Sequence, residues 1–375
     1  MIRALRHHTR AAWLFPCAVV GVILNCVPVH SRAAEGPGQW LEKMNQALAN
    51  RNYDGTFFHL SGGRVETMRI VHRVRAGRVM ERLQLLDGPG REFVRNNDEL
   101  TCYLPDQHTI LVEPRQDHGP FLGSLPQFGA ETNEYYRLEA LPDARILGRT
   151  AHVIAVNPKD QYRFGYRLWL DEKTAMPLKT QLCDSHGEVL EQILFARLEM
   201  PENIADSELA PTVKTEGMRW VRQGPAHEAA SASLSGFRVS ELPPGFKLTV
   251  EGAQTIGDAS APASHLVYSD GLATVSVFIE AEAPPPAPVT TGTGAAAGAV
   301  TGSVTGGVTG SVTGADPAPA VPSDTPVQGL ARVGSGYAFS TVVQGHQVTA
   351  VGEVPALTVE FIAHSVKGGQ DPAHH

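Results

Sequence analysis

The chain has 375 residues, which is enough for two domains of ordinary size that each bury their own core. Charged residues make up 19% of it, and its formal net charge at pH 7 is −8. No block of lysine and arginine is dense enough to follow a phosphate backbone, so we exclude nucleic acid as a partner.

The first 33 residues have the pattern of a secretory signal peptide. Three arginines precede an apolar run at 11–29, and a small-residue exit follows from Ser31 to Ala33. A retained membrane anchor is the alternative, since about 19 apolar residues almost span a bilayer, but Pro16, Pro28 and the small-residue exit favour cleavage. Cleavage after Ala33 removes four arginines and no acidic residue, which takes the charge from −8 to −12. We expect an acidic mature protein in the periplasm.

A short amphipathic helix and a run of strands come next. Apolar residues recur at helical spacing between Trp40 and Leu48, after a Gly-Pro-Gly start. Period-two segments separated by glycine-rich or proline-rich turns predict a curved antiparallel sheet. These segments are 53–60, 65–74, 78–86, 92–95, 100–104 and 109–113. We expect a second helix at 131–141, before another strand at 151–157.

The most regular pattern lies between residues 162 and 198. Tyr166, Leu168 and Leu170 alternate with Arg167 and Trp169, which is the period of a strand with one buried face. Two more strands, at 178–183 and 189–198, follow after turns. This meander ends the N-terminal domain, which we place at 34–200.

The remainder of the chain divides into a connection and a second domain. Residues 201–234 have no sustained period and are predicted to be a linker, and 235–375 form the C-terminal domain. Strands are predicted at 237–239, 247–250, 265–268, 273–280, 338–343 and 347–351. A helix begins at Pro355, with Leu357, Phe361 and Ile362 on its apolar side.

An insertion at 284–328 interrupts this second domain. It contains a Val-Thr-Gly repeat flanked by runs of proline and alanine. Residues this small cannot bury enough apolar surface to offset the entropy lost on ordering, so we predict a disordered loop.

Two cysteines, Cys102 and Cys183, remain after removal of the signal peptide. Export to an oxidising compartment permits a disulfide between them. Such a bridge would close a loop of about 80 residues and stabilise the fold by up to ~4 kcal/mol on the chain-entropy model. The alternative is two separately buried thiols, each packing as a small apolar side chain.

The sequence has no constellation typical of catalysis or metal binding. It contains 15 histidines, but no HExxH spacing and no G-x-S-x-G elbow. His59 and His72 fall on predicted strands, where we expect them at the surface or half-buried. We therefore predict no catalytic residue, no metal and no other cofactor.

Three motifs add to the meander and the signal peptide. They are Leu86-Asp87-Gly88-Pro89 with the following Arg91-Glu92-Phe93-Val94, the segment from Leu266 to Leu272, and Val351-Gly352-Glu353-Val354-Pro355. In this order they resemble the MucB/RseB family of periplasmic regulators of an envelope-stress sigma factor. The resemblance covers about 38–200 and 235–368. The Val-Thr-Gly repeat and the linker have no counterpart in the family pattern.

The resemblance implies an α+β protein. Its N-terminal domain would be a half-open antiparallel β-barrel with helices, as in lipoprotein carriers, and its C-terminal α+β domain would be smaller. It implies binding to the periplasmic part of a membrane-bound MucA/RseA-type anti-sigma factor, which is thereby shielded from proteolysis. Lipopolysaccharide or mislocalised lipoprotein would release that partner, and homo-oligomers are left open.

A half-open barrel has an apolar concave face that suits acyl chains. The candidate residues for this face are Phe57, Met68, Ile70, Leu83, Leu85 and Trp169, and ordinary core packing is the alternative for each. A periplasmic carrier of lipid or lipoprotein is the second functional hypothesis. The barrel alone would permit that function, but a simple carrier does not need the second domain. An enzyme, the third hypothesis, has no supporting residues.

Overall fold

The computed structural model describes residues 35–114, 121–124, 128–129, 132–222, 236–254, 263–280 and 328–368. The predicted signal peptide, and the predicted insertion except for its last residue, lie outside the described residues. Within the ranges just given, no helix has both the length and the apolar character needed to span a membrane.

The N-terminal part of the chain is built on one sheet of twelve strands. The strands are β1 (Tyr53–Ser61), β2 (Arg64–Arg75), β3 (Arg78–Leu85), β4 (Glu92–Asn96), β5 (Glu99–Leu104), β6 (Thr109–Pro114), β7 (Tyr136–Ile146), β8 (Arg149–Pro158), β9 (Gly165–Asp171), β10 (Pro177–Cys183), β11 (Val189–Glu199) and β12 (Arg219–Arg222). Their order is β12-β6-β5-β4-β3-β2-β1-β11-β10-β9-β8-β7, so β12 and β7 are the two edges. Only β12 and β6 run parallel. The predicted half-open antiparallel barrel is confirmed.

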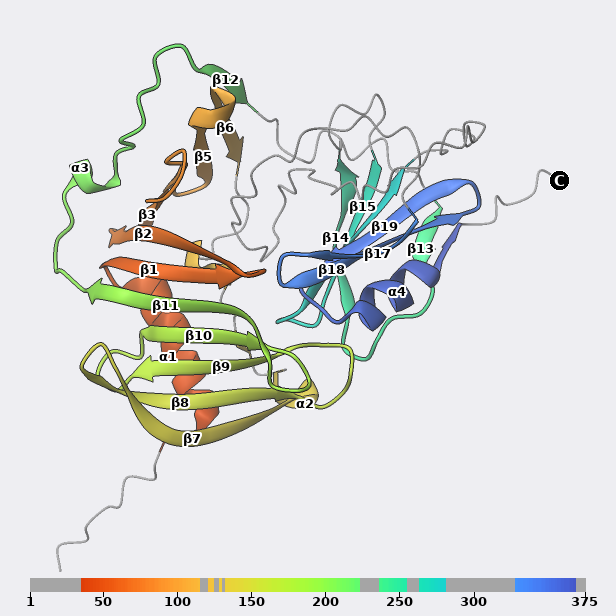
Figure 1. The fold of residues 1–375 in the computed structure, drawn as a ribbon, viewed down its shortest axis with the longest axis horizontal. Coiled ribbons are helices and arrows are strands. Elements are labelled where there is room, and N and C mark those ends of the chain that lie inside the picture. Colours follow the sequence, from red (N-terminus) through yellow and green to blue (C-terminus); the bar gives the residue numbers. More distant parts are fainter. Residues whose placement is uncertain are drawn as a thin grey trace, which may run out of the picture. The chain divides into compact units, whose positions relative to one another are not determined.

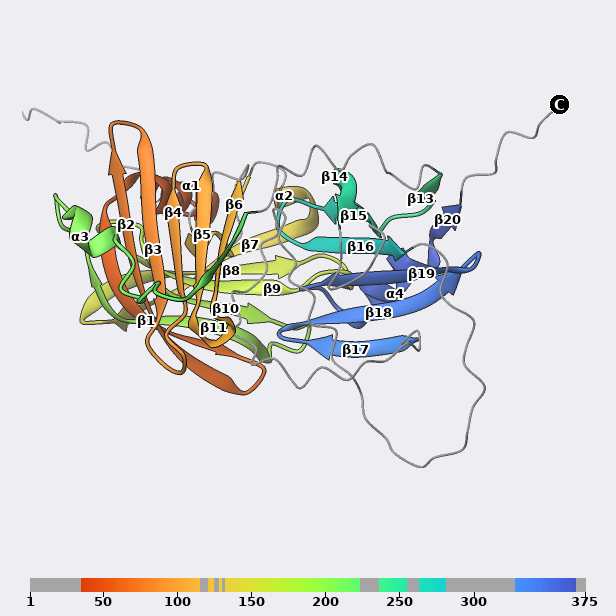
Figure 2. The same ribbon diagram turned by 90° about the horizontal axis from the view of Figure 1, so that it is seen from above.

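Helix α1 (Pro37–Asn50) lies on the inner, concave face of this sheet, as Figure 1 and Figure 2 show. Proline occupies its first turn, and Leu41, Met44, Ala47 and Leu48 form the buried stripe. No side chain caps its N-terminus, and neither end carries a charge that compensates the helix dipole. The helix is therefore held by packing against the sheet rather than by its own termini.

The second predicted helix is mostly wrong. Only Thr132–Tyr135 is helical (α2), and the chain then enters strand β7. Leu147 and Gly148 both have positive φ, 51° and 73°, in the two-residue turn that joins β7 to β8. Positive φ at both central residues is the signature of a tight hairpin turn. Pairing with β8 therefore overrides the helix propensity of this segment.

The predicted linker is largely attached to the N-terminal sheet. Ile204 and Leu209, the latter in helix α3 (Asp206–Leu209), pack against Val71 and Met80. Val71 alternates with the inward-facing Ile70, so this contact covers the outer face. Residues 201–222 thus cross that face and end as strand β12.

The C-terminal part forms a second, six-stranded antiparallel sheet in the order β14-β15-β16-β19-β18-β17. Its strands are β14 (Lys247–Gln254), β15 (Ala263–Ser269), β16 (Thr274–Glu280), β17 (Gly329–Val333), β18 (Gly336–Val343) and β19 (His346–Gly352). Strands β13 (Phe237–Val239) and β20 (Val366–Gly368) pair separately. Short 3-10 turns at Pro105–Gln107 and Phe121–Ser124 complete the elements.

Helix α4 (Ala356–His364) packs on one face of the six-stranded sheet, beside β18 and β19. Its buried residues are Thr358, Val359, Ile362 and Ala363. The predicted apolar side was partly wrong, because Leu357 is 41% exposed. The helix is apolar on most of its surface, so composition alone did not identify the face that meets the sheet.

Candidate functional site

Five of the six predicted cavity residues lie together on the inner face of the twelve-stranded sheet. Phe57 pairs across strands with Met68, Met68 with Leu85, and Ile70 with Leu83. Each is 6% exposed or less, in the same cluster as the buried stripe of α1. The structure thus brings the five side chains together, with α1 packed over them.

Trp169 does not share this face. It alternates along β9 with Leu168 and Leu170, which are fully buried, so its side chain projects from the outer face. The ring is half-buried, and Lys179 Nζ lies 4.4 Å from its centre. The alternation along β9 thus places Trp169 on the other face of the sheet from the five residues above, although its ring is partly buried against the same cluster.

The side of α1 away from the apolar cluster borders a polar hollow of about 500 Å³. Trp40, Lys43 and Arg51 line it along the length of the helix, and Glu172 and Lys173 line it from the turn after β9.

A row of polar residues crosses the inner face at one end of the apolar cluster. Tyr53, His72, Glu81 and Arg95 lie opposite one another on β1 to β4. All four are at most 2% exposed, and Arg95 Nη1 donates to Glu81 Oε2 at 3.0 Å. We expected His72 at the surface or half-buried, and that was wrong. The sequence did carry a signal for this burial. His72 follows Met68 and Ile70 at intervals of two residues on β2, so its side chain points to the same inner face.

His72 in this row is held in its neutral form. The His72 ring stacks on Tyr53 with centroids 4.5 Å apart, and His72 Nδ1 lies 2.8 Å from the carbonyl oxygen of Arg51. Burial lowers the pKa of His72 to about 4, so the ring is neutral. The Nδ1 hydrogen must then point at the carbonyl. Tyr53 Oη is buried with no hydrogen-bond partner among the described residues.

A second site joins the twelve-stranded sheet to the six-stranded sheet through Arg163. Its guanidinium lies 2.6 Å from Asp270 Oδ2 and 3.0 Å from Asp160 Oδ1, and it also donates to the carbonyl oxygen of Pro244. Tyr136 Oη donates to Asp270 at 3.0 Å. The side chains of Arg163 and Asp270 are fully buried.

Aromatic rings and a glycine complete this junction. The Arg163 guanidinium lies 4.8 Å from the Tyr135 ring centre and 5.3 Å from that of Phe246. Gly245 has φ 84°, and a Cβ there would lie 2.5 Å from the Tyr135 ring. Only glycine fits that position, since any side chain would collide with the ring.

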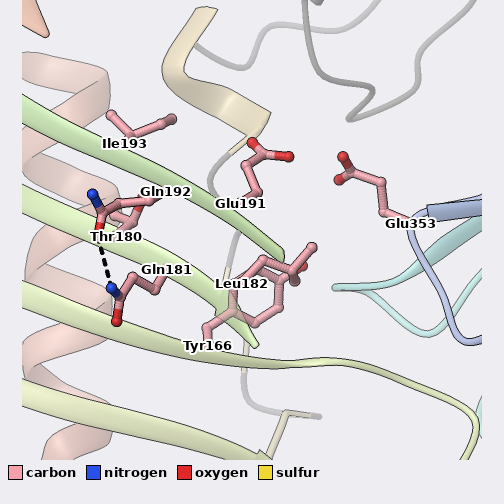
Figure 3. A pocket seen from close by; sticks show the side chains of 8 residues that line it. All are labelled: Tyr166, Thr180, Gln181, Leu182, Glu191, Gln192, Ile193 and Glu353. Carbon is pink, nitrogen blue, oxygen red and sulfur yellow. Dashed lines mark hydrogen bonds between the residues drawn. The ribbon is translucent and has the colours of Figure 1, made fainter. Parts of the chain in front are cut away.

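A third site lies beside it, where acidic side chains meet. His59 Nε2 is 3.1 Å from Glu191 Oε1, and His59 Nδ1 is 3.5 Å from Glu66 Oε2. Ser335 Oγ is 2.9 Å from Glu191 Oε2 and 2.6 Å from Glu353 Oε1. Figure 3 shows the carboxyl ends of Glu191 and Glu353 facing one another. Both residues line a hollow of about 20 Å³.

Burial and charge set the protonation of this third site. Burial opposes protonation of His59, but hydrogen bonds with Glu191 and Glu66 outweigh it and raise its pKa to about 9. Burial likewise opposes ionisation of Glu191, yet the hydrogen bond with His59 lowers its pKa. Burial and then the charge of Glu191 raise the pKa of Glu353 to about 8. At neutral pH, His59 and Glu191 are charged and Glu353 is protonated. We expected His59, like His72, at the surface or half-buried. That was wrong, because His59 is only 5% exposed.

The two cysteines do not form the disulfide that the sequence allowed. Cys102 lies on β5 and Cys183 on β10, six steps apart in the strand order, and both are buried as thiols. Strands are spaced by about 4.8 Å, so six steps along the sheet far exceed the Cα separation of about 7 Å that a bridge permits. Two separately buried thiols, the alternative, are what the structure contains.

Comparison with known proteins gives matches along the chain. Residues 36–213 match the family described as MucB/RseB N-terminal domain, and 231–322 match MucB/RseB C-terminal domain. Sigma factor AlgU regulatory protein MucB of Pseudomonas aeruginosa is 32% identical over 254 residues, 67% of this chain and 77% of the relative. Sigma-E factor regulatory protein RseB of Escherichia coli K12 is 25% identical over 95% of this chain and 98% of its own length.

Solved structures of MucB are similar in fold. The structure of the Pseudomonas aeruginosa MucA/MucB complex matches with a TM-score of 0.63 and 27% identity, over 89% of this chain and 99% of that one. A crystal structure of MucB matches with a TM-score of 0.54 and 27% identity, over 88% and 98%.

Proposed function

The chain belongs to the MucB/RseB family, and from that premise we propose that it is a periplasmic negative regulator of an envelope-stress sigma factor. It binds the periplasmic part of a membrane-bound anti-sigma factor of the MucA/RseA type and shields that partner from proteolysis. Lipid signals, either lipopolysaccharide or mislocalised lipoprotein, release the partner.

The observation that carries the proposal is similarity over both domains to a protein solved in complex with MucA. Two of the three motifs behind the resemblance also supply residues of the contacts between the sheets. Asp270 comes from the 266–272 motif and Glu353 from the 351–355 motif. A regulator that responds to one ligand by releasing another needs coupled domains, whereas a carrier does not.

A pull-down tests the partner. The mature chain, beginning near Ala34, is immobilised and exposed to a detergent extract of the cell envelope. We expect recovery of a membrane-bound anti-sigma factor, and we expect added mature chain to slow cleavage of its purified periplasmic part by the protease that begins its destruction. Recovery of lipoproteins alone would instead favour the carrier hypothesis.

The lipid part of the proposal places acyl chains on the inner face in exchange for α1. Displacing the helix exposes Leu41, Met44 and Leu48, and each costs about 1.5–3 kcal/mol of lost burial. An acyl chain regains about 0.8 kcal/mol per buried methylene, so roughly six to eleven methylenes offset that cost. No side chain caps the N-terminus of the helix to resist the exchange.

This exchange predicts a threshold in acyl length. In a series of saturated fatty acids, affinity measured by calorimetry should be negligible below about eight carbons and then rise steeply with each added methylene. A series that binds with the same affinity at every length would contradict burial of the chain on the inner face.

Substitution on one strand separates the inner face from the surface. Ile70→Asn places a polar group under α1, whereas Val65→Asn changes a residue of the same strand that is 59% exposed. After circular dichroism has shown that both fold, we expect Ile70→Asn to retain the anti-sigma partner but lose the response to lipid. Val65→Asn should behave as the parent does. Equal loss in both variants would count against the assigned face.

A further inference from the structure

Three side chains meet where β11 contacts the loop after β19: Glu191, Ser335 and Glu353. If both carboxyls were ionised, these side chains would have too few hydrogens to form both hydrogen bonds. Ser335 Oγ is within hydrogen-bond distance of both Glu191 and Glu353, at 2.9 and 2.6 Å. A hydroxyl has one hydrogen, so it can donate to only one of the two carboxyls. The other short contact needs a proton on the carboxyl itself. Geometry alone therefore places one additional proton in this contact.

We propose that this contact is a proton-operated latch between the two sheets, which closes by taking up one proton on Glu353 and opens when that proton is lost. When closed, Glu353 donates to Ser335 and Ser335 donates to Glu191. When Glu353 ionises, its carboxylate faces that of Glu191, and the two charges repel one another.

The surrounding groups assign the proton to Glu353 rather than to Glu191. Glu191 on β11 is already paired with His59 on β1, which is in turn paired with Glu66 on β2. Those three groups all lie on the twelve-stranded sheet, so their pairing needs no residue from the other sheet. Glu353 and Ser335 come from the other sheet, and Tyr166 on β9 is the remaining titratable group that lines the site.

The direction of the pH effect follows from these pairs. With the latch open, the Glu353 carboxyl ionises near its ordinary pKa of 4.5, and with the latch closed it ionises only near pH 8. Between these values the closed form holds a proton that the open form releases. Each unit of rising pH in that window therefore weakens closure by up to tenfold, and the effect levels off above pH 8.

Three variants separate the latch from ordinary packing. Glu353→Gln is uncharged and can still donate to Ser335, so its latch should stay closed from pH 5 to pH 9. Ser335→Ala removes the bridging hydroxyl and should weaken closure at every pH while retaining the pH dependence. Glu251→Gln makes the same charge change at an exposed residue of β14 and is the matched control.

Two measurements on the mature full-length chain test the proposal. Carbon-13 NMR of labelled glutamate, assigned through Glu353→Gln, should show one side-chain carboxyl titrating near pH 8. Hydrogen exchange, corrected for its intrinsic pH dependence, should show protection at the start of β11 and in 335–353 that falls with pH in the parent and the Glu251→Gln control, but not in Glu353→Gln. Titration of Glu353 near pH 4.5, or the same pH dependence in Glu353→Gln as in the parent, would overturn the latch.

Discussion

At the scale of single residues, this fold buries charge in partnered sets. Arg163 and Asp270 have no exposed side-chain surface, and they pair with one another although they are 107 residues apart in the sequence. Taking such charges out of water costs several kcal/mol, which the pairing recovers only while both partners are present.

Removing one partner should therefore lower the stability of the fold strongly. Asp270→Ala leaves the Arg163 charge buried, and we expect a loss of about 3–5 kcal/mol in the free energy of unfolding, measured with urea. Asp143→Ala breaks the exposed pair with His152 and should cost at most about 1 kcal/mol. Similar costs for the two variants would show that the Arg163 junction is not closed in solution.

Two buried tyrosines should respond in opposite ways to loss of the hydroxyl. Tyr53 Oη has no partner among the described residues, so Tyr53→Phe should raise the free energy of unfolding by about 1 kcal/mol. Tyr136 Oη donates to Asp270, so Tyr136→Phe should lower it by about 1–3 kcal/mol. The same urea titrations measure both, and a loss in Tyr53→Phe would mean that its hydroxyl is satisfied.

A buried neutral histidine should make the fold sensitive to acid. Burial lowers the pKa of His265 from 6.5 to about 4, so the folded chain resists a proton that the unfolded chain accepts. Its contribution is intact above pH 6.5 and is lost as the pH falls towards 4, by about 3 kcal/mol in all. His265→Gln should make stability fall less between pH 6.5 and pH 4.5. An unchanged slope would contradict the lowered pKa.

At the scale of elements, strands with strict alternation were predictable, whereas several short ones were not. The predicted strands between residues 53 and 113 begin and end within two residues of the observed ones. Period-two alternation marks the buried face of each strand, and glycine turns mark its ends. Strands β12, β17 and β20 were missed. Their three to five residues carry no alternation, and β17 is exposed throughout, so only pairing with a neighbour defines them.

The inner face could be predicted from the alternation of residues along each strand, but the contacts between the sheets could not be predicted. The spacing of Phe57, Met68 and Ile70 along their strands indicates a buried face. Arg163, Asp270 and Glu353 lie in turns and loops, where no period distinguishes a buried charge from a solvated one. Their roles follow only from tertiary packing.

The separation of β5 and β10 predicts independent thiols. Thiol titration of the denatured, unreduced mature protein should find two reactive groups, and the losses in stability from Cys102→Ser and Cys183→Ser should add. One measurement decides against this account: an absence of reactive thiols before reduction.

At the scale of the whole molecule, the family order of two domains was predictable, since the motifs occur in sequence along the chain. The extent of the linker was not, because 201–222 have no period of their own and bind the outer face of a sheet formed by other residues. Because 201–222 are attached to the N-terminal sheet, the connection to the second domain is shorter than the predicted linker.

The insertion should be dispensable for folding. Deleting 286–323 shortens the predicted loop, and the entropy of loop closure grows only slowly with length. We expect a melting temperature within a few degrees of the parent, by calorimetry, and unchanged affinity for the anti-sigma partner. A large drop in either would assign the Val-Thr-Gly repeat a structural role.

In the proposed function, lipid and the anti-sigma factor bind this protein at coupled sites. Calorimetric titration of the mature chain with the partner's periplasmic part, with and without saturating lipopolysaccharide, measures that coupling. We predict that lipid weakens the partner and that the partner weakens lipid by the same factor, as linkage requires. Equal partner affinity in both titrations, with lipid demonstrably bound, would contradict the account and leave a carrier or scaffold.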